Sequence, residues 1–258
     1  MIKRDLREEI AEKLERISDN SHVYDGRMRL VRDTLRSMGD VYSFWVENPE
    51  LRRSLYMENK QPDTVMKIAR KGTRAIKDAW YFLMDHGRGR DFSEVLNEDI
   101  LIGANAIVNG GSASDGRFRR KDVTLNIPGY TPPSFGKVPQ KVREVISRIN
   151  ETFNEDPVEN AIYVHLALSL IQPFNHANKR TARLVQDRLL LDAGLPPVMI
   201  PAGEGKFYMG LLSKAAPGFR DGETESQEPF YNYIASKVNN GLDYVLNDLG
   251  EDVGRIAS

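Results

Sequence analysis

A short polar turn that carries three cations is the part of this sequence with the clearest chemical potential. Residues 172–183 read Gln-Pro-Phe-Asn-His-Ala-Asn-Lys-Arg-Thr-Ala-Arg, and an apolar run lies on each side. This arrangement predicts two helices that meet at a turn. The backbone N–H groups at the start of the second helix would point into the turn, where they favour an anion. Since Lys179, Arg180 and Arg183 add positive charge, the pattern predicts a phosphate-binding site.

A solvated loop between two helices is the alternative interpretation of the same residues. Cations near a helix N-terminus oppose the helix dipole, which favours negative charge at that end. A purely structural loop would therefore gain little from placing three of them together.

Helical spacing of apolar residues recurs along most of the chain, so the elements that must position this turn are mainly helices. The predicted helices cover residues 2–17, 28–46, 50–61, 65–86, 93–108, 141–153, 157–171, 184–191, 206–215 and 230–249. The helix over 157–171 is apolar nearly all round, which predicts a central, buried position. Alternating apolar residues near 123–127 predict a short β-hairpin within 116–129 that rests on the helices. The polar segment 217–228 is predicted to be a surface loop.

Composition excludes several classes of protein. With 258 residues, of which 40% are hydrophobic, the chain can bury a sizeable core. A formal net charge of -1 argues against a general nucleic-acid binder. The absence of cysteine excludes disulfides and a thiolate nucleophile or metal ligand. No apolar run approaches the roughly 20 residues that span a bilayer, and the first residues lack the apolar core of a secretory signal, so we expect a cytoplasmic protein without a membrane segment.

The turn and its surroundings resemble the Fic/Doc family, whose signature is His-Pro-Phe-x-Asp/Glu-Gly-Asn-Gly/Lys-Arg-x-x-Arg. The residues kept here are Pro173, Phe174, Asn178, Lys179, Arg180 and Arg183. Gly116-Arg-Phe-Arg resembles the start of the family's flap, and the resemblance extends over at least 116–200. It implies a mainly α fold, a Fic-like helical bundle with one β-hairpin flap. The implied domains are an N-terminal helical region, 1–110, and a Fic-like core, 111–258, or one continuous domain made of both.

Three positions of the signature differ in this chain. Gln172 stands where the family has its catalytic histidine, His176 where it has a metal-binding acid, and Ala177 where it has glycine. In the family the histidine takes a proton from a protein hydroxyl that attacks the α-phosphate of ATP. A glutamine amide cannot take that proton, and its loss as a base costs about 10²- to 10⁴-fold in rate. Imidazole is also a poor ligand for Mg²⁺, so ordinary metal-assisted transfer is in doubt and no metal ligands are assigned.

The resemblance therefore implies two functions. One is a nucleotide-dependent enzyme that transfers AMP or phosphate to a protein hydroxyl with Gln172 and His176 at the catalytic positions. The other is a catalytically inactive Fic-like regulator that binds a nucleotide or a protein. In both, ATP or another nucleotide is held by Asn178, Lys179, Arg180 and Arg183. A protein substrate or partner would dock at the flap, 116–128, and a homo-oligomer is left open.

Ser54, Glu58 and Asn59 match the family's inhibitory pattern, Ser/Thr-x-x-x-Glu-Gly/Asn, within the helix predicted at about 50–61. In the subgroup that carries this pattern before the core, the glutamate pairs with the second arginine of the signature. The resemblance therefore implies autoinhibition by an ion pair between Glu58 and Arg183.

Two histidines near the turn need separate interpretations. His176 has the basicity to replace the lost histidine, but it follows Gln172 by four residues across a tight turn, so local hydrogen bonding is the favoured interpretation. His165 lies seven residues before Gln172, about 10 Å away by the helical rise. It resembles a histidine often found on the preceding helix of the family, and we interpret it as a core residue.

Overall fold

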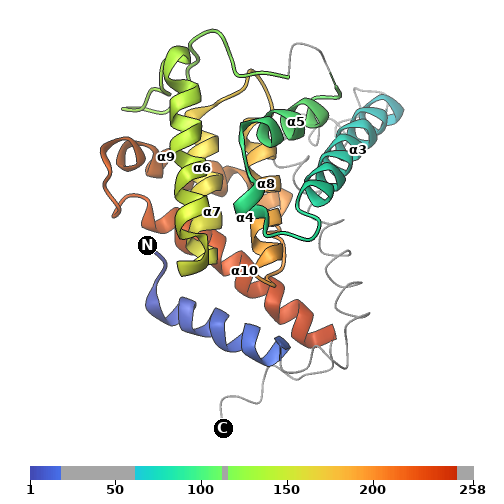
Figure 1. Ribbon diagram of the computed structural model, residues 1–258, viewed down its shortest axis with the longest axis vertical. Helices are drawn as coiled ribbons and strands as arrows, with labels where there is room; N and C mark the ends of the chain where they lie inside the picture. The colour runs from blue at the N-terminus through green and yellow to red at the C-terminus, as the bar shows by residue number, and fades with distance from the viewer. Residues whose placement is uncertain (19–61, 112–115, 249–258) are drawn as a thin grey trace.

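The computed structural model describes residues 1–18, 62–111 and 116–248, and these residues fold mainly into helices (Figure 1). Residues 4–18 form an N-terminal helix. The further helices are α3 (Pro62–His86), α4 (Phe92–Val95), α5 (Glu98–Val108), α6 (Val138–Thr152), α7 (Pro157–Ile171), α8 (Asn178–Asp192), α9 (Gly205–Asp221) and α10 (Glu228–Asp248). Three short 3₁₀ turns join them: η1 (Phe135–Lys137), η2 (Phe153–Glu155) and η3 (Ala202–Glu204). The mainly helical fold is confirmed.

The pair α7 and α8 forms the centre of the molecule, with α6, α10, α3 and α5 packed against it (Figure 1). α7 begins at Pro157, where the Asp156 side chain accepts a hydrogen bond of 2.9 Å from the Glu159 N–H. Apolar residues occupy every side of α7, so from Asn160 to Ile171 nearly every side chain is buried. The predicted central position of this helix is confirmed. Its C-terminal end therefore presents the turn at a fixed place.

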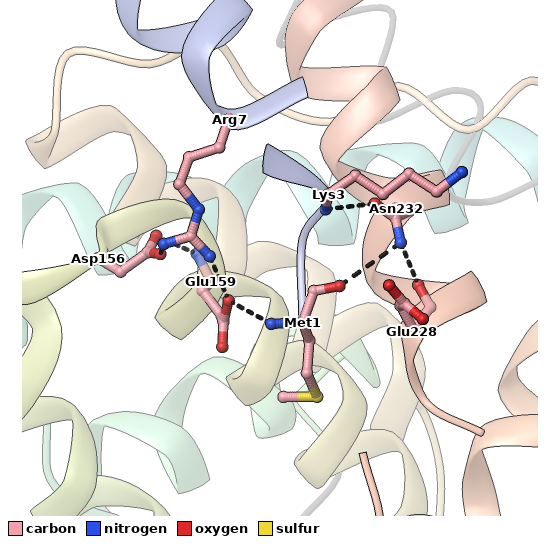
Figure 2. A network of polar contacts seen from close by, with 7 residues as sticks. All are labelled: Met1, Lys3, Arg7, Asp156, Glu159, Glu228 and Asn232. Carbon is pink, nitrogen blue, oxygen red and sulfur yellow. Dashed lines mark hydrogen bonds and ion pairs between the residues drawn. The ribbon is translucent and has the colours of Figure 1, made fainter. Parts of the chain in front are cut away.

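Ion pairs and hydrogen bonds join the N-terminal segment to the start of α7 and to α10 (Figure 2). Arg7 forms ion pairs with Asp156 and with Glu159, the latter at 2.8 Å. The Lys3 backbone N–H donates a hydrogen bond of 2.8 Å to the Asn232 side chain. Arg7 is 48% exposed, so these polar contacts contribute modestly, and burial of the apolar face supplies most of the stabilisation. The buried residues of that face are Ile2, Ile10 and Ile17.

The predicted β-hairpin is wrong for the part of the chain that the structure describes. Residues 116–134 form no strand. The alternation did identify the inward side, because Val123 and Leu125 are half-buried and Ile127 is buried. However, Asn126 adopts a left-handed conformation with φ 47°, which interrupts an extended strand. The Arg119 N–H donates to the Pro173 carbonyl at 2.9 Å, so here the segment bonds to the turn instead of to a neighbouring strand.

Several predicted boundaries also moved. α8 begins at Asn178, so the apolar run over 184–191 is its second half and the cations of the turn belong to its first two turns. α9 continues to Asp221 with Pro217 inside it, so the predicted loop over 217–228 is partly helical, and Gly222 at φ 74° ends the helix. The helices predicted at 28–46 and 50–61 lie outside the described residues, and the proposed boundary at 110/111 stays a prediction. Within the described ranges, no helix has the length and apolar character needed to cross a membrane.

Candidate active site

The turn between α7 and α8 starts and ends in left-handed backbone conformations, and the Asn178 side chain holds it closed. Gln172 has φ 52° and Ala177 has φ 59°. The Asn178 side-chain oxygen accepts a hydrogen bond of 2.8 Å from the Phe174 N–H. Its amide donates to the Phe174 carbonyl and to the Gln172 side-chain carbonyl, each at 2.9 Å. Both amide donors are thus used within the turn, which assigns the Asn178 side chain a role in shaping it.

The Gln172 side chain is fixed from both of its polar ends. Its Nε2 donates a hydrogen bond of 2.6 Å to the Ser169 carbonyl, one turn back in α7. Its Oε1 accepts from Asn178, as described above. A glutamine amide has no basicity near neutral pH, so at this position it links α7 to α8 by hydrogen bonds and cannot act as a base.

Arg119 joins the segment before the turn to the end of α7. Its side chain is fully buried. The guanidinium donates to the Gln172 carbonyl at 2.7 Å and to the Lys121 carbonyl at 2.8 Å, and it also bonds to the carbonyls of Pro133 and Ile171. Burial lowers the pKa of Arg119 from its usual value, and the charge of Asp122 opposes that effect. The planar fork of an arginine suits several carbonyls at once, which a lysine could not match.

Asn105 supports the turn from the side of α5. Its buried amide donates hydrogen bonds of 3.0 Å to the His176 carbonyl and to the Thr181 hydroxyl. Thr181 in turn donates to the Ala177 carbonyl at 3.1 Å. Sequence reasoning named neither Asn105 nor Arg119 as a site residue. A signal existed for Asn105, because it is a lone polar residue in the apolar run from Ile100 to Val108.

The cations of the predicted phosphate site gather at the first turns of α8. Lys179 and Arg180 are half-buried. Arg183 is only 4% exposed, and its guanidinium carbon lies 5.9 Å from the centre of the Tyr208 ring. Ala177, which precedes the helix, offers no side-chain cap to the first N–H groups of α8. The positive end of the helix dipole and the three cations thus lie in the same part of α8, next to the turn.

His165 is a core residue beneath this site, as the sequence predicted. It is completely buried, with its Nδ1 2.7 Å from the Gln186 Oε1 and its Nε2 2.8 Å from the Tyr208 hydroxyl. Burial, assisted by the charges of Arg183 and Lys179, lowers the pKa of His165 to about 3. The neutral ring donates from Nδ1, since Gln186 Oε1 can only accept, and so the Tyr208 hydroxyl donates to Nε2.

His176 lies exposed on the turn, and its backbone carbonyl is the atom bonded to Asn105. Over the described ranges, no group of three or more His, Asp or Glu side chains is placed to hold a metal ion. The imidazole of His176 does not match the oxygen ligands that Mg²⁺ requires. The predicted inhibitory residues Ser54, Glu58 and Asn59 lie outside the described residues.

Known proteins resemble this chain in sequence over the region that contains the turn. Residues 95–190 match the Fic/DOC family model. The protein adenylyltransferase fic-1 of Caenorhabditis elegans is 29% identical over 149 residues, which cover 57% of this chain and 28% of the relative. The protein adenylyltransferase Fic of Drosophila persimilis is 33% identical over 156 residues, covering 59% and 29%. The chain thus spans less than a third of the length of these relatives.

Solved structures agree at the level of the fold. A Fic domain-containing signaling protein from Bacteroides thetaiotaomicron superposes with a TM-score of 0.75 at 17% identity, covering 97% of this chain and 99% of the other. A Fic family protein from Desulfovibrio desulfuricans gives 0.70 at 18% identity, covering 100% and 78%. Because the family model matches residues 95–190 and the fold agrees with a solved Fic domain, these residues are a Fic/DOC family domain.

Proposed function

We propose that this chain is a Fic-type regulator that binds a nucleotide such as ATP through its phosphates at the start of α8, without standard adenylyl transfer. Lys179, Arg180 and Arg183 supply the charge, and the helix N-terminus supplies N–H groups and a favourable dipole. Ala177, in a left-handed conformation directly before α8, offers these N–H groups no side-chain cap.

The observation that carries this proposal is the pair of hydrogen bonds on the Gln172 side chain. Both ends of the amide are used to hold the turn, to Ser169 and to Asn178. Gln172, at the position of the family's base, therefore stabilises the turn and accepts no proton from a hydroxyl. With His176 in place of a carboxylate, the turn also lacks the hard oxygen ligand that would fix Mg²⁺ on the phosphates.

A second candidate is an enzyme that transfers AMP or phosphate to a protein hydroxyl with altered catalytic residues. The names of the matched relatives, which are protein adenylyltransferases, favour it. In a solved structure with a TM-score of 0.50 to this chain, IbpAFic2 is covalently tethered to Cdc42, so one protein of this fold engages a protein target. In this candidate, a protein partner of this chain would dock along 116–128, beside the turn.

Regulation by Glu58 is a further part of the proposal. An ion pair between Glu58 and Arg183 would place a carboxylate where a terminal phosphate of the nucleotide would otherwise bind. The burial of Arg183 supports such a competition between Glu58 and a phosphate. An anion that approaches the buried guanidinium has to displace the groups that already surround it.

The test combines binding and transfer on the full chain. Calorimetry with ATP should show binding that Arg183→Ala weakens about tenfold or more, the loss expected for a charge-assisted contact. Arg143→Gln removes an exposed cation from α6, away from the turn, and should bind ATP as the native chain does. Unchanged affinity in Arg183→Ala would contradict the proposed phosphate site.

Incubation with α-labelled and with γ-labelled ATP separates the two candidates. The regulator leaves no label on the chain or on proteins of a lysate. Covalent label from either nucleotide that is absent in Arg183→Ala would establish the enzyme and overturn the regulator. The position of the label would then distinguish AMP transfer from phosphate transfer.

A further inference from the structure

A cavity of about 490 Å³ opens between α6, α7 and the C-terminal end of α9. None of the residues from 172 to 183 lines it, so it is separate from the candidate active site. Its volume falls within the range of about 300–1,000 Å³ that is usual for small-molecule sites. It therefore has the size of a binding site of its own.

Positive charge dominates the lining of this cavity. The lining cations are Lys137, Lys141, Arg148 and Arg220, and the lining acid is Glu144. Lys141 pairs with Glu144 at 2.6 Å, and Arg220 pairs with Asp221 at 2.7 Å. For Lys137 and Arg148, no ion pair with a carboxylate occurs among the described residues. Two positive charges thus face the cavity uncompensated.

Arg148 is held in a defined orientation. Its guanidinium carbon lies 3.9 Å from the centre of the Tyr163 ring, which is a cation–π contact. Burial raises the pKa of Tyr163, and the charge of Arg148 opposes that rise. A guanidinium carries five N–H donors, so one that contacts a tyrosine can still donate to a carboxylate or phosphate.

The spacing of the two cations limits the ligand. Lys137 directly precedes α6 and Arg148 lies in its third turn, so along the helix axis they are separated by roughly 16 Å at 1.5 Å per residue. This spacing suits a ligand with two separated anionic groups, one for each cation. Between them the wall is apolar, through Val145, Ile171 and Phe219.

We propose that this cavity is a second binding site, which takes a small organic anion with two separated negative groups, phosphates or carboxylates. The two groups contact Lys137 and Arg148, and the organic middle covers the apolar wall. This inference is independent of nucleotide binding at α8. Because Ile171 is the last residue before Gln172, the ligand would lie directly behind the turn.

Calorimetric titration of the full chain with fructose 1,6-bisphosphate, as a probe with two separated phosphates, tests the proposal. We expect saturable binding that Lys137→Gln and Arg148→Gln each weaken about tenfold, and that the neutral sugar fructose does not show. Arg143→Gln is the matched control, because it removes one cation from the same helix outside the cavity. Lys137 is exposed, so its substitution leaves the fold intact even if Arg148→Gln does not.

Each remaining outcome counts against the proposal. No binding to the native chain contradicts it. Binding lost in Arg183→Ala but kept in both cavity variants assigns the bisphosphate to the turn at α8. An equal loss in Arg143→Gln indicates a general charge effect. Tighter binding of an acidic peptide than of the bisphosphate, abolished by Lys137→Gln, would identify a protein-docking surface instead.

Discussion

The Asn178 side chain donates a hydrogen bond of 2.9 Å to the side chain of Gln172, so the first residue of α8 is tied to the residue that ends α7. A histidine at position 172 could receive this bond only through an unprotonated ring nitrogen. The glutamine therefore does more than remove a base, because it supplies an acceptor that keeps the turn closed.

Removing the Asn178 side chain should open the turn. Asn178→Ala leaves the Phe174 N–H and the Gln172 Oε1 without partners in a largely buried place, so we expect a loss of about 2–3 kcal/mol in the free energy of unfolding. Urea denaturation measures it. The exposed Asn175 in the same turn is the matched control, and Asn175→Ala should change the value by less than about 0.5 kcal/mol. Equal effects in the two variants would contradict the role assigned to Asn178.

Arg119→Lys should loosen the segment around 116–134 while keeping the charge. A lysine cannot reach the four carbonyls that the guanidinium contacts, so amide hydrogen exchange in this segment should become faster. The exposed neighbour provides the control, since Arg120→Lys should exchange at the native rate. Native protection in Arg119→Lys would show that the segment is held by other contacts.

His165 should make the fold sensitive to acid. Its pKa falls from 6.5 to about 3 on folding, so below pH 6.5 the unfolded chain binds a proton that the folded chain does not. Stability is then lost as the pH falls from 6.5 toward 3, with a limiting slope of about 1.4 kcal/mol per pH unit from this group. We expect His165→Gln to show a shallower slope between pH 7 and 5.5 in urea titrations. The same slope in both proteins would mean that His165 is not held neutral.

Restoring the family's residues should restore its chemistry. Gln172→His with His176→Asp returns the base and a hard oxygen ligand to the turn, so transfer of label from α-labelled ATP should rise about 10²-fold or more in the presence of Mg²⁺. His176→Asp alone serves as the control without a base and should remain near background. A double variant that binds ATP yet transfers no label would place the defect elsewhere in the site.

Removing the carboxylate of Glu58 should strengthen nucleotide binding. Under the proposed inhibition, Glu58→Gly frees the position of a terminal phosphate, and ATP affinity should rise several-fold by calorimetry, whereas Glu58→Gln should show a smaller rise because it keeps the bulk of the side chain. In an Arg183→Ala background the gain should vanish. A gain in ATP affinity that persists in the Arg183→Ala background would contradict the ion pair between Glu58 and Arg183.

The sequence predicted the helices whose apolar residues form continuous faces, and above all α7, because burial on every side leaves a plain signature from Ala161 to Ile171. It also placed the cations of the turn, since Lys179, Arg180 and Arg183 follow one another at helical spacing. The prediction of a β-hairpin at 116–129 was wrong. The alternation of apolar residues there indicated which side chains point inward, but not which groups the backbone bonds to.

The hydrogen bonds with which Arg119 and Asn105 hold the turn could not be predicted from the sequence for a related reason. Arg119 and Asn105 act through backbone carbonyls that lie 53 and 71 residues further along the chain. Carbonyl acceptors are the same in every residue, so the sequence does not identify the partner of such a contact, even where a lone polar residue such as Asn105 marks its donor. The hydrogen bonds of the Asn178 side chain within the turn were also not predicted, and its role toward a nucleotide stays a prediction.

The two left-handed residues of the turn bear on the order in which this domain assembles. Gln172 and Ala177 carry side chains that disfavour this conformation by about 1 kcal/mol each, so the isolated segment would rarely adopt it. Hydrogen bonds from Asn105, Arg119 and Asn178, which belong to three different segments of the chain, stabilise its shape. We therefore expect the turn to form late, after α5 and the 116–134 segment have reached α7 and α8, so that the candidate site is completed only when the rest of the domain is in place.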